Sequence, residues 1–228
     1  MGDFGSLRRE LRLFASKKKA IVLQRFFKTG PGEYAEGDIF LGVTVPDARR
    51  IARRHLGLKL KEVLVLLRSK IHEERLAALL IMLEKFNQEE DKIYKAYLRN
   101  LKYVNNWDLV DLSADKIAGR HLINRPKQDL YKLARSKNVW ARRVAMIATF
   151  YFIKNNQFQD AFKIARILLQ DKHDLIHKAA GWMLREVGKR DFGAEEKFLR
   201  RHYKAMPRTM LRYAIEKFPE SKRKQYLA

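Results

Sequence analysis

The chain has 228 residues, 46% of them hydrophobic, so it is long and apolar enough to bury the core of a folded domain. Its 49 Lys and Arg residues outnumber 26 Asp and Glu residues, and the resulting net charge of +23 predicts a polyanionic partner, for which nucleic acid fits better than an anionic membrane. Cysteine is absent, which excludes a disulfide framework, a thiolate metal site and a cysteine nucleophile.

The pattern of apolar residues predicts an all-α fold in a single domain over 1–228. We expect an N-terminal helix over 6–28 and helical repeats over 46–220, because apolar residues recur at helical spacing and no alternating strand pattern is sustained. Between them, residues 29–44 are expected to form a loop. Its turn-forming residues are Gly30, Pro31, Gly32, Gly37 and Gly42.

Four of the expected helices share a basic residue that is followed two positions later by alanine. The spacings between the alanines are 68, 35 and 34 residues. Because 68 is twice 34, the pattern predicts a period of about 34 residues with two helices per unit, which is typical of an α-α superhelix, or solenoid. The four alanines are Ala77, Ala145, Ala180 and Ala214.

The alanine is the small residue that lets neighbouring helices pack closely. The basic residue two positions earlier lies about 200° round the helix, so we expect it to face outward while the alanine faces the core. Stacked in register, the basic residues would line one side of the solenoid. They are Arg75, Arg143, Lys178 and Arg212.

One repeat lacks its alanine, since the residue 34 positions after Ala77 is Asp111. A buried carboxylate is costly unless it is paired or neutralised. Asp111 is therefore either a structural residue, ion-paired or exposed, or a carboxylate held at a functional site. Trp107 lies one turn earlier on the same helical face, and an aromatic ring beside a carboxylate suits a cationic ligand within a nucleic acid. Trp140 and Trp182 occupy the corresponding helices of the next two repeats.

Taken in order, these motifs resemble the HEAT-like-repeat alkylpurine DNA glycosylases, the AlkD-type DNA alkylation repair family. The resemblance covers roughly residues 20–220 and implies a solenoid of HEAT-like repeats with a concave basic face. The motifs that carry it are Arg25-Phe-Phe-Lys28, Gly37-Asp-Ile-Phe-Leu-Gly-Val43 with Pro46 and Arg49, Trp107–Asp111, Trp140-Ala-Arg-Arg143, Lys178-Ala-Ala-Gly-Trp182-Met-Leu-Arg185-Glu186 and Met206-Pro-Arg-Thr-Met-Leu-Arg-Tyr213.

The resemblance implies a DNA glycosylase of base excision repair, which hydrolyses the N-glycosidic bond of cationic N3- or N7-alkylated purines in duplex DNA. No lysine lies in the motif from Trp107 to Asp111, so we expect a monofunctional hydrolase, and we expect no cofactor. By position, Asp111 matches the catalytic carboxylate, and Trp107 and Trp182 match the aromatics that flank the lesion. Arg143 matches a basic residue that grips the DNA backbone. Further candidates for backbone contacts are Arg75, Lys178, Arg185 and Arg212, with Arg49, Arg50, Arg53 and Arg54 near the loop.

Two positions depart from some members of that family. Asn106 precedes Trp107 where an additional aromatic can occur, and Phe26 stands where a tyrosine can occur. These departures leave a non-catalytic binder of damaged or branched DNA open as an alternative on the same fold. A protein-binding scaffold is a third interpretation, although the charge of +23 fits it poorly.

Nothing in the sequence predicts a metal site or a membrane segment. The one HxxxH spacing, from His173 to His177, lacks the Glu of the zinc-protease motif and is expected to be chance. Residues 1–20 lack the apolar run of a signal peptide, and no stretch reaches the roughly 18 apolar residues of a membrane span. We expect a cytoplasmic monomer, nucleoid-associated in a prokaryote, that binds double-stranded DNA.

Overall fold

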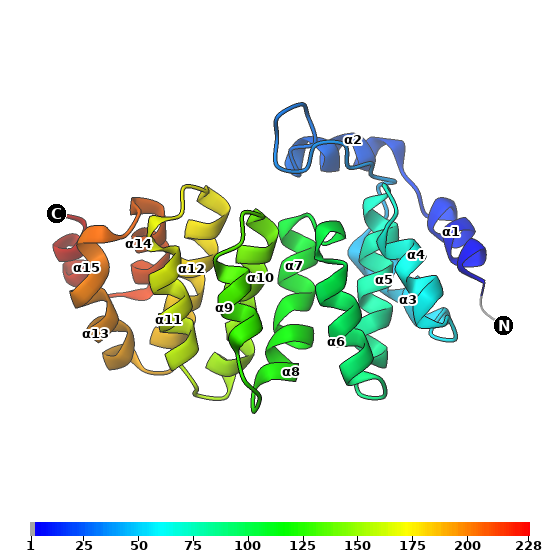
Figure 1. Ribbon diagram of the computed structural model, residues 1–228. Helices are drawn as coiled ribbons and strands as arrows, with labels where there is room; N and C mark the ends of the chain where they lie inside the picture. Colours follow the sequence, from blue (N-terminus) through cyan, green and yellow to red (C-terminus); the bar gives the residue numbers. More distant parts are fainter. Residues whose placement is uncertain (1–2) are drawn as a thin grey trace. The chain divides into compact units, whose positions relative to one another are not determined.

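The computed structural model describes residues 3–228, which are predominantly helical (Figure 1). The isolated β-type pairing in this range is a parallel bridge between Ile39 and Ile71. The all-α class predicted from the sequence is confirmed. Where the sequence predicts one domain, the chain divides into two compact units, Met1–Ser113 and Ala114–Ala228. None of the helices in residues 3–228 has both the length and the hydropathy that a membrane crossing requires.

The first unit is organised around helix α5. Every residue of α5 from His72 to Met82 is buried, because α3 and α4 pack against it and α1 packs against all three. The helices of this unit are α1 (Phe4–Leu13), α2 (Lys17–Phe26), α3 (Val45–Arg54), α4 (Leu60–Leu67), α5 (His72–Lys85), α6 (Glu90–Arg99) and α7 (Trp107–Ala114), with a 3-10 turn η1 at Leu101–Tyr103.

The N-terminal segment 6–28 is two helices, α1 and α2, and the expectation of one continuous helix is wrong. The chain turns at Ser16, whose hydroxyl accepts a hydrogen bond from the Lys19 amide (3.4 Å) and caps α2. The Ser16 amide donates to the carbonyl of Leu41 (2.9 Å) rather than to a helical carbonyl. Serine competes for backbone hydrogen bonds in this way, which is why it favours helix N-termini over helix interiors.

Residues 29–44 form a loop, as their glycine and proline content predicts. Gly42 shows why glycine is required there, since its φ is 81° and a Cβ would lie 2.2 Å from the carbonyl oxygen of Ser16. The loop therefore passes directly against the backbone at the start of α2.

The second unit stacks its helices in two rows (Figure 1). Helices α10, α12 and α14 pack on one another in that order, and we call them the even row. Helices α9, α11 and α13 form the odd row, in which α9 packs against α10, α11 against α10 and α12, and α13 against α12. These pairings are the α-α repeats that the period of about 34 residues predicts.

The elements of the second unit begin with a π-helical turn that continues from α7. They are η2 (Asp115–Gly119), α8 (Arg120–Leu122), α9 (Gln128–Ala134), α10 (Val139–Lys154), α11 (Gln159–Ile167), η3 (Leu168–Gln170), α12 (Asp174–Gly188), α13 (Phe192–His202), η4 (Tyr203–Ala205), α14 (Arg208–Ala214), η5 (Ile215–Lys217) and α15 (Glu220–Leu227).

The alanines of the repeat pattern are packing residues, as predicted. Ala77 on α5 and its counterparts on α10, α12 and α14 are all 0% exposed. The expectation that the basic residue two positions earlier faces outward is half wrong. Lys178 and Arg212 are partly or fully exposed, but Arg75 and Arg143 are only 3% and 5% exposed. The helices that carry Arg75 and Arg143 are covered on more than one side, so a rotation of about 200° does not reach solvent.

We expect Gly181→Ala to destabilise the protein by about 1–3 kcal/mol, because overpacking a close helix contact forces backbone shifts. A Cβ at Gly181 on α12 would lie 2.4 Å from the carbonyl oxygen of Met210 and 2.5 Å from the Cβ of Tyr213 on α14. Urea unfolding measures the change. Gly57→Ala is the matched control, since nothing lies within 4 Å of a Cβ there. Equal stability of the two variants would contradict this account of the α12–α14 contact.

We expect Glu195→Gln to remove a pH dependence of stability. Glu195 on α13 is 1% exposed, and burial raises its pKa to about 9 despite the opposing charge of Arg185. Its ordinary pKa is 4.5, so the folded chain binds the extra proton and the wild type loses stability relative to the variant as pH rises from 4.5 to 9. One proton corresponds to a slope of at most about 1.4 kcal/mol per pH unit. Unfolding by urea at several pH values measures the difference in unfolding free energy between the wild type and the variant. A difference that stays constant across this pH range would refute the raised pKa. Glu220→Gln, at an exposed position, is the control.

Candidate functional site

Helix α7 carries Trp107 and Asp111 one turn apart, as the sequence predicts. The Asn106 side chain, fully buried, accepts the Trp107 amide (2.8 Å) where the helix begins. Leu109 and Val110 are 0% exposed and face the core, whereas Trp107 and Asp111 are partly exposed. The residue in place of the repeat alanine therefore keeps access to solvent, and Asn106 is explained by its role at the start of the helix.

The indole of Trp107 is clamped by the glycine-rich loop and its flanks. Its Nε1 donates a hydrogen bond to the hydroxyl of Tyr34 (3.2 Å). Its ring stacks on Phe27 with centroids 5.2 Å apart and planes at 27°, and Phe26 meets it edge-on at 5.9 Å. No role for Tyr34 or Phe27 was predicted from the sequence, because these residues lie 73 and 80 positions before Trp107 in the chain.

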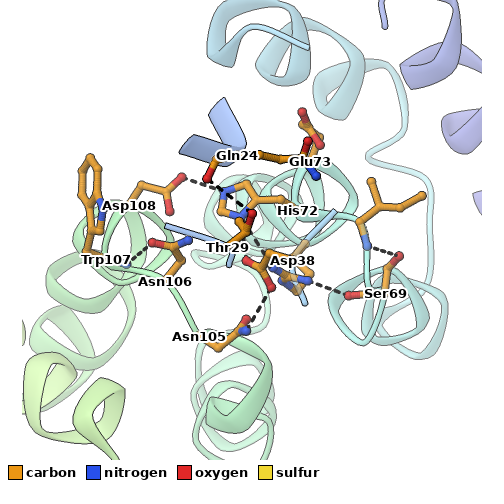
Figure 2. A network of polar contacts seen from close by, with 12 residues as sticks. Gln24, Thr29, Asp38, Ser69, His72, Glu73, Asn105, Asn106, Trp107 and Asp108 are labelled. Carbon is orange, nitrogen blue, oxygen red and sulfur yellow. Dashed lines mark hydrogen bonds and ion pairs between the residues drawn. The ribbon is translucent and has the colours of Figure 1, made fainter. Parts of the chain in front are cut away.

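A buried polar network ties the same loop to α5 and to the start of α7 (Figure 2). Asp38 of the loop accepts hydrogen bonds from Arg75 Nη2 (2.6 Å) and Asn105 Nδ2 (3.2 Å). The two ring nitrogens of His72 face two carboxylates, with Nδ1 3.4 Å from Asp38 Oδ2 and Nε2 2.8 Å from Asp108 Oδ2. These contacts join three segments that are far apart in the sequence.

The contacts of the network shift the pKa values of Asp38 and His72 toward their charged forms. Burial raises the pKa of Asp38, but the hydrogen bond from His72 and the charge of Arg75 outweigh it and hold that pKa below its usual range. Burial lowers the pKa of His72, but the hydrogen bonds to Asp108 and Asp38 outweigh it and raise that pKa. Arg75, predicted to contact DNA, is engaged inside this network, and we leave it out of the interface proposed below.

A largely apolar pocket of about 630 Å³ adjoins the network, between α2, the loop and α5. Phe26, Phe27 and Phe40 contribute rings to its wall, and His72 and Asp108 contribute polar atoms. Its volume is that of a small-molecule site.

Of the other predicted residues, Arg49, Arg50, Arg53 and Arg54 lie on α3 of the first unit, and the rest lie on the even row of the second unit. Trp182 on α12 is partly exposed, and its Nε1 donates to Glu186 Oε1 (3.1 Å) while Phe150 packs at 5.8 Å. Arg143 on α10 is buried and donates from Nη1 to the carbonyl of Leu175 (2.5 Å).

Three further predicted cations follow along the even row. Lys178 on α12 pairs with Asp174 at 2.7 Å, and Arg185 pairs with Glu216. Arg212 on α14 is exposed. Arg143, Lys178, Arg185 and Arg212 therefore share one row of helices, as the repeat alignment indicates for three of them.

We expect Tyr34→Phe to release the indole of Trp107, because the variant keeps the ring of Tyr34 and removes only the hydroxyl that accepts the hydrogen bond. The chain has three tryptophans, so the indole N–H region of an NMR spectrum contains three signals, and Trp107→Phe assigns one. That signal should shift and exchange faster with solvent in Tyr34→Phe. Tyr103→Phe removes a hydroxyl four residues before Trp107 and should leave the signal unchanged; an unchanged signal in Tyr34→Phe would refute the clamp.

Comparison with known proteins relates this geometry to one family. A structural match is the predicted DNA alkylation repair enzyme from Enterococcus faecalis, with a TM-score of 0.74 and 16% sequence identity over 90% of this chain and 97% of that chain. At that identity the likeness shows the fold, an α-α superhelix. No curated protein matches the chain.

The sequence itself matches the family model described as DNA alkylation repair enzyme over residues 7–218. The match spans both compact units, and it includes Trp107, Asp111 and Trp182. The chain therefore belongs to the DNA alkylation repair enzyme family.

Proposed function

We propose that this protein is a monofunctional DNA glycosylase, which hydrolyses the N-glycosidic bond of cationic N3- or N7-alkylated purines in duplex DNA. The observation that carries the proposal is the pairing of Trp107 and Asp111 on one partly exposed face of α7, in a family of DNA alkylation repair enzymes. The net charge of +23 supports a DNA substrate.

The chemistry suits a carboxylate without a strong general acid. An N3- or N7-alkylated purine already carries a positive charge, so it departs with the electron pair of the C1′–N bond and needs no added proton. Positive charge develops on the sugar as that bond breaks, and the carboxylate of Asp111 stabilises it. Water then forms the new bond to C1′, positioned by Asp111, and its proton passes to the carboxylate or to solvent.

The aromatic residues recognise the charge of the lesion. A cationic base over the face of a tryptophan gains about 0.5–2 kcal/mol by cation–π attraction. Trp107 and Trp182 are both partly exposed, and each has its indole N–H bonded within its own unit, to Tyr34 and Glu186. Both rings are therefore held before substrate arrives, which reduces the ordering cost of binding.

We propose that the protein binds one DNA duplex as a monomer. Cations of the even row contact the backbone of that duplex. Arg212 is exposed, and Lys178 and Arg185 are held by the carboxylates of Asp174 and Glu216. Arg143 on α10 is included on the family resemblance alone, because its guanidinium is buried and donates to the carbonyl of Leu175. Contacts of this kind position the protein without reading sequence, and they make affinity fall steeply with salt.

A non-catalytic binder of damaged or branched DNA is the second candidate. It is favoured by two side chains near Trp107 that lack the groups some family members carry. Asn106 is fully buried at the start of α7, so no additional aromatic is presented there, and Phe26 has no hydroxyl. The two candidates share a DNA interface and differ in base release.

The test is release of methylated purines from methylated duplex DNA under single-turnover conditions. We expect release by the wild type and a loss of at least about 100-fold in Asp111→Asn, a range typical of removing one preorganised stabilising group. Affinity for undamaged duplex should not change. Asp129→Asn on α9 removes an equal charge elsewhere and should retain activity.

Two results would overturn the assignment. Equal activity in Asp111→Asn and the wild type would remove Asp111 from the reaction. No release by the wild type, with tight and salt-sensitive DNA binding, would favour the non-catalytic binder.

A further inference from the structure

A second cationic site lies on the odd row, between α11 and α13. These helices border a groove of about 450 Å³. None of the residues that line it is acidic. Its charged and titratable lining residues are Lys163, Arg166, Lys197, Arg201 and His202.

The cations form two short rows along the groove. Lys163 and Arg166 lie one turn apart on α11, and Lys197 and Arg201 lie one turn apart on α13. At 1.5 Å per residue, each pair spans about 4.5–6 Å along its helix. Four charges at this spacing on two facing helices suit an extended polyanion better than a single small anion.

The acidic residues of the two helices do not cancel this charge. Asp160, the acid of α11, accepts the hydroxyl of Tyr131. On α13, Glu195 is buried with its pKa raised to about 9 and is neutral at pH 7. Glu196 pairs with Arg200 and Lys222.

The groove cations differ from those of the even row, where Lys178 and Arg185 have carboxylate partners. Among the described residues, Lys163, Arg166, Lys197 and Arg201 have no ion-pair partner within 4 Å. The imidazole of His202 responds to the resulting potential: burial lowers its pKa first, and the charges of Arg166 and Arg201 lower it further. Uncompensated like charges repel, and an anion relieves that cost.

Aromatic rings line the same groove. Phe162 stacks on Phe198 with centroids 5.1 Å apart and planes at 14°, and His202 packs on Phe198 at 4.6 Å. Phe162 is partly exposed in the groove. A positive groove with aromatic surface is the arrangement by which proteins hold a nucleic-acid strand without reading its sequence.

We propose that the α11–α13 groove binds the sugar–phosphate backbone of a second nucleic-acid segment. The even and odd rows form separate layers of the second unit, so this site is distinct from the row that carries Trp182 and Arg212 (Figure 1). One protein molecule then holds two segments at once. The inference does not require glycosylase activity.

The experiment measures bridging with undamaged DNA. The protein is bound to a bead-tethered duplex, the excess is washed away, and retention of a labelled second oligonucleotide is measured, single-stranded in one arm and duplex in another. We expect the wild type to retain the second oligonucleotide. The fourfold variant Lys163→Gln, Arg166→Gln, Lys197→Gln, Arg201→Gln should retain at least about tenfold less, because it lacks the cations that contact phosphate. Each lost phosphate contact should also reduce the salt dependence of binding, by about 0.9 in the slope of log affinity against log salt concentration. All four positions are exposed, so the variant should fold.

A matched control separates the groove from total charge. Lys61→Gln, Lys92→Gln, Lys95→Gln, Arg99→Gln removes four exposed cations from α4 and α6 of the first unit and should bridge like the wild type. An equal loss in both fourfold variants would overturn the proposal in favour of a general charge effect. Bridging by the groove variant at the level of the wild type would also overturn the proposal. So would displacement of the labelled oligonucleotide by inorganic phosphate at the same concentration of phosphate groups.

Discussion

The candidate site of the first unit depends on the buried contacts of Asp38. Its carboxylate receives Arg75 from α5 and Asn105 from the approach to α7, and it faces His72, which reaches Asp108 on α7. Removing one partner of such a buried pair costs about 3–5 kcal/mol, because it leaves a charge without compensation. The loop, α5 and α7 are thereby held in a single arrangement. Phe27 and Tyr34, which both precede Asp38 in the sequence, are in turn positioned to hold the ring of Trp107.

Close packing by small residues has the corresponding role in the second unit. Ala145, Ala180 and Ala214 are fully buried along the even row, and Gly181 brings the backbones of α12 and α14 together where no Cβ fits. Residues of this size carry little chemistry, and the side chains proposed to be functional lie beside them in the sequence. Trp182 follows Gly181 directly in the sequence, and its ring is held by Glu186 and Phe150.

Local periodicity made the helices, the loop at 29–44 and the buried alanines predictable from the sequence, because each depends on neighbours within a few turns. The contacts of Tyr34 and Asp38 were not predictable, since their partners lie 34–73 positions away. The prediction that Arg75 and Arg143 face outward was wrong, because helical geometry gives the direction of a side chain but not which neighbouring helices cover it. The break between α1 and α2 at Ser16 was not predicted, because the apolar periodicity continues through this residue. The hydroxyl of Ser16 caps α2 and its amide bonds to the carbonyl of Leu41 instead of continuing the helix.

Net charge predicts a polyanionic partner, but the distribution of carboxylates determines how each cation can serve it. In the proposed interface on the even row, a phosphate that contacts Lys178 or Arg185 competes with Asp174 or Glu216 for the cation, so that contact gains less free energy. Such a surface favours a phosphate only where the geometry matches, which suits the proposed role of this row in aligning a lesion. No carboxylate lines the groove of the odd row, so an anion that binds there displaces none. A holding site for a second strand requires affinity without alignment. In the two proposals taken together, the even row aligns the DNA that carries the lesion and the groove of the odd row retains a second segment.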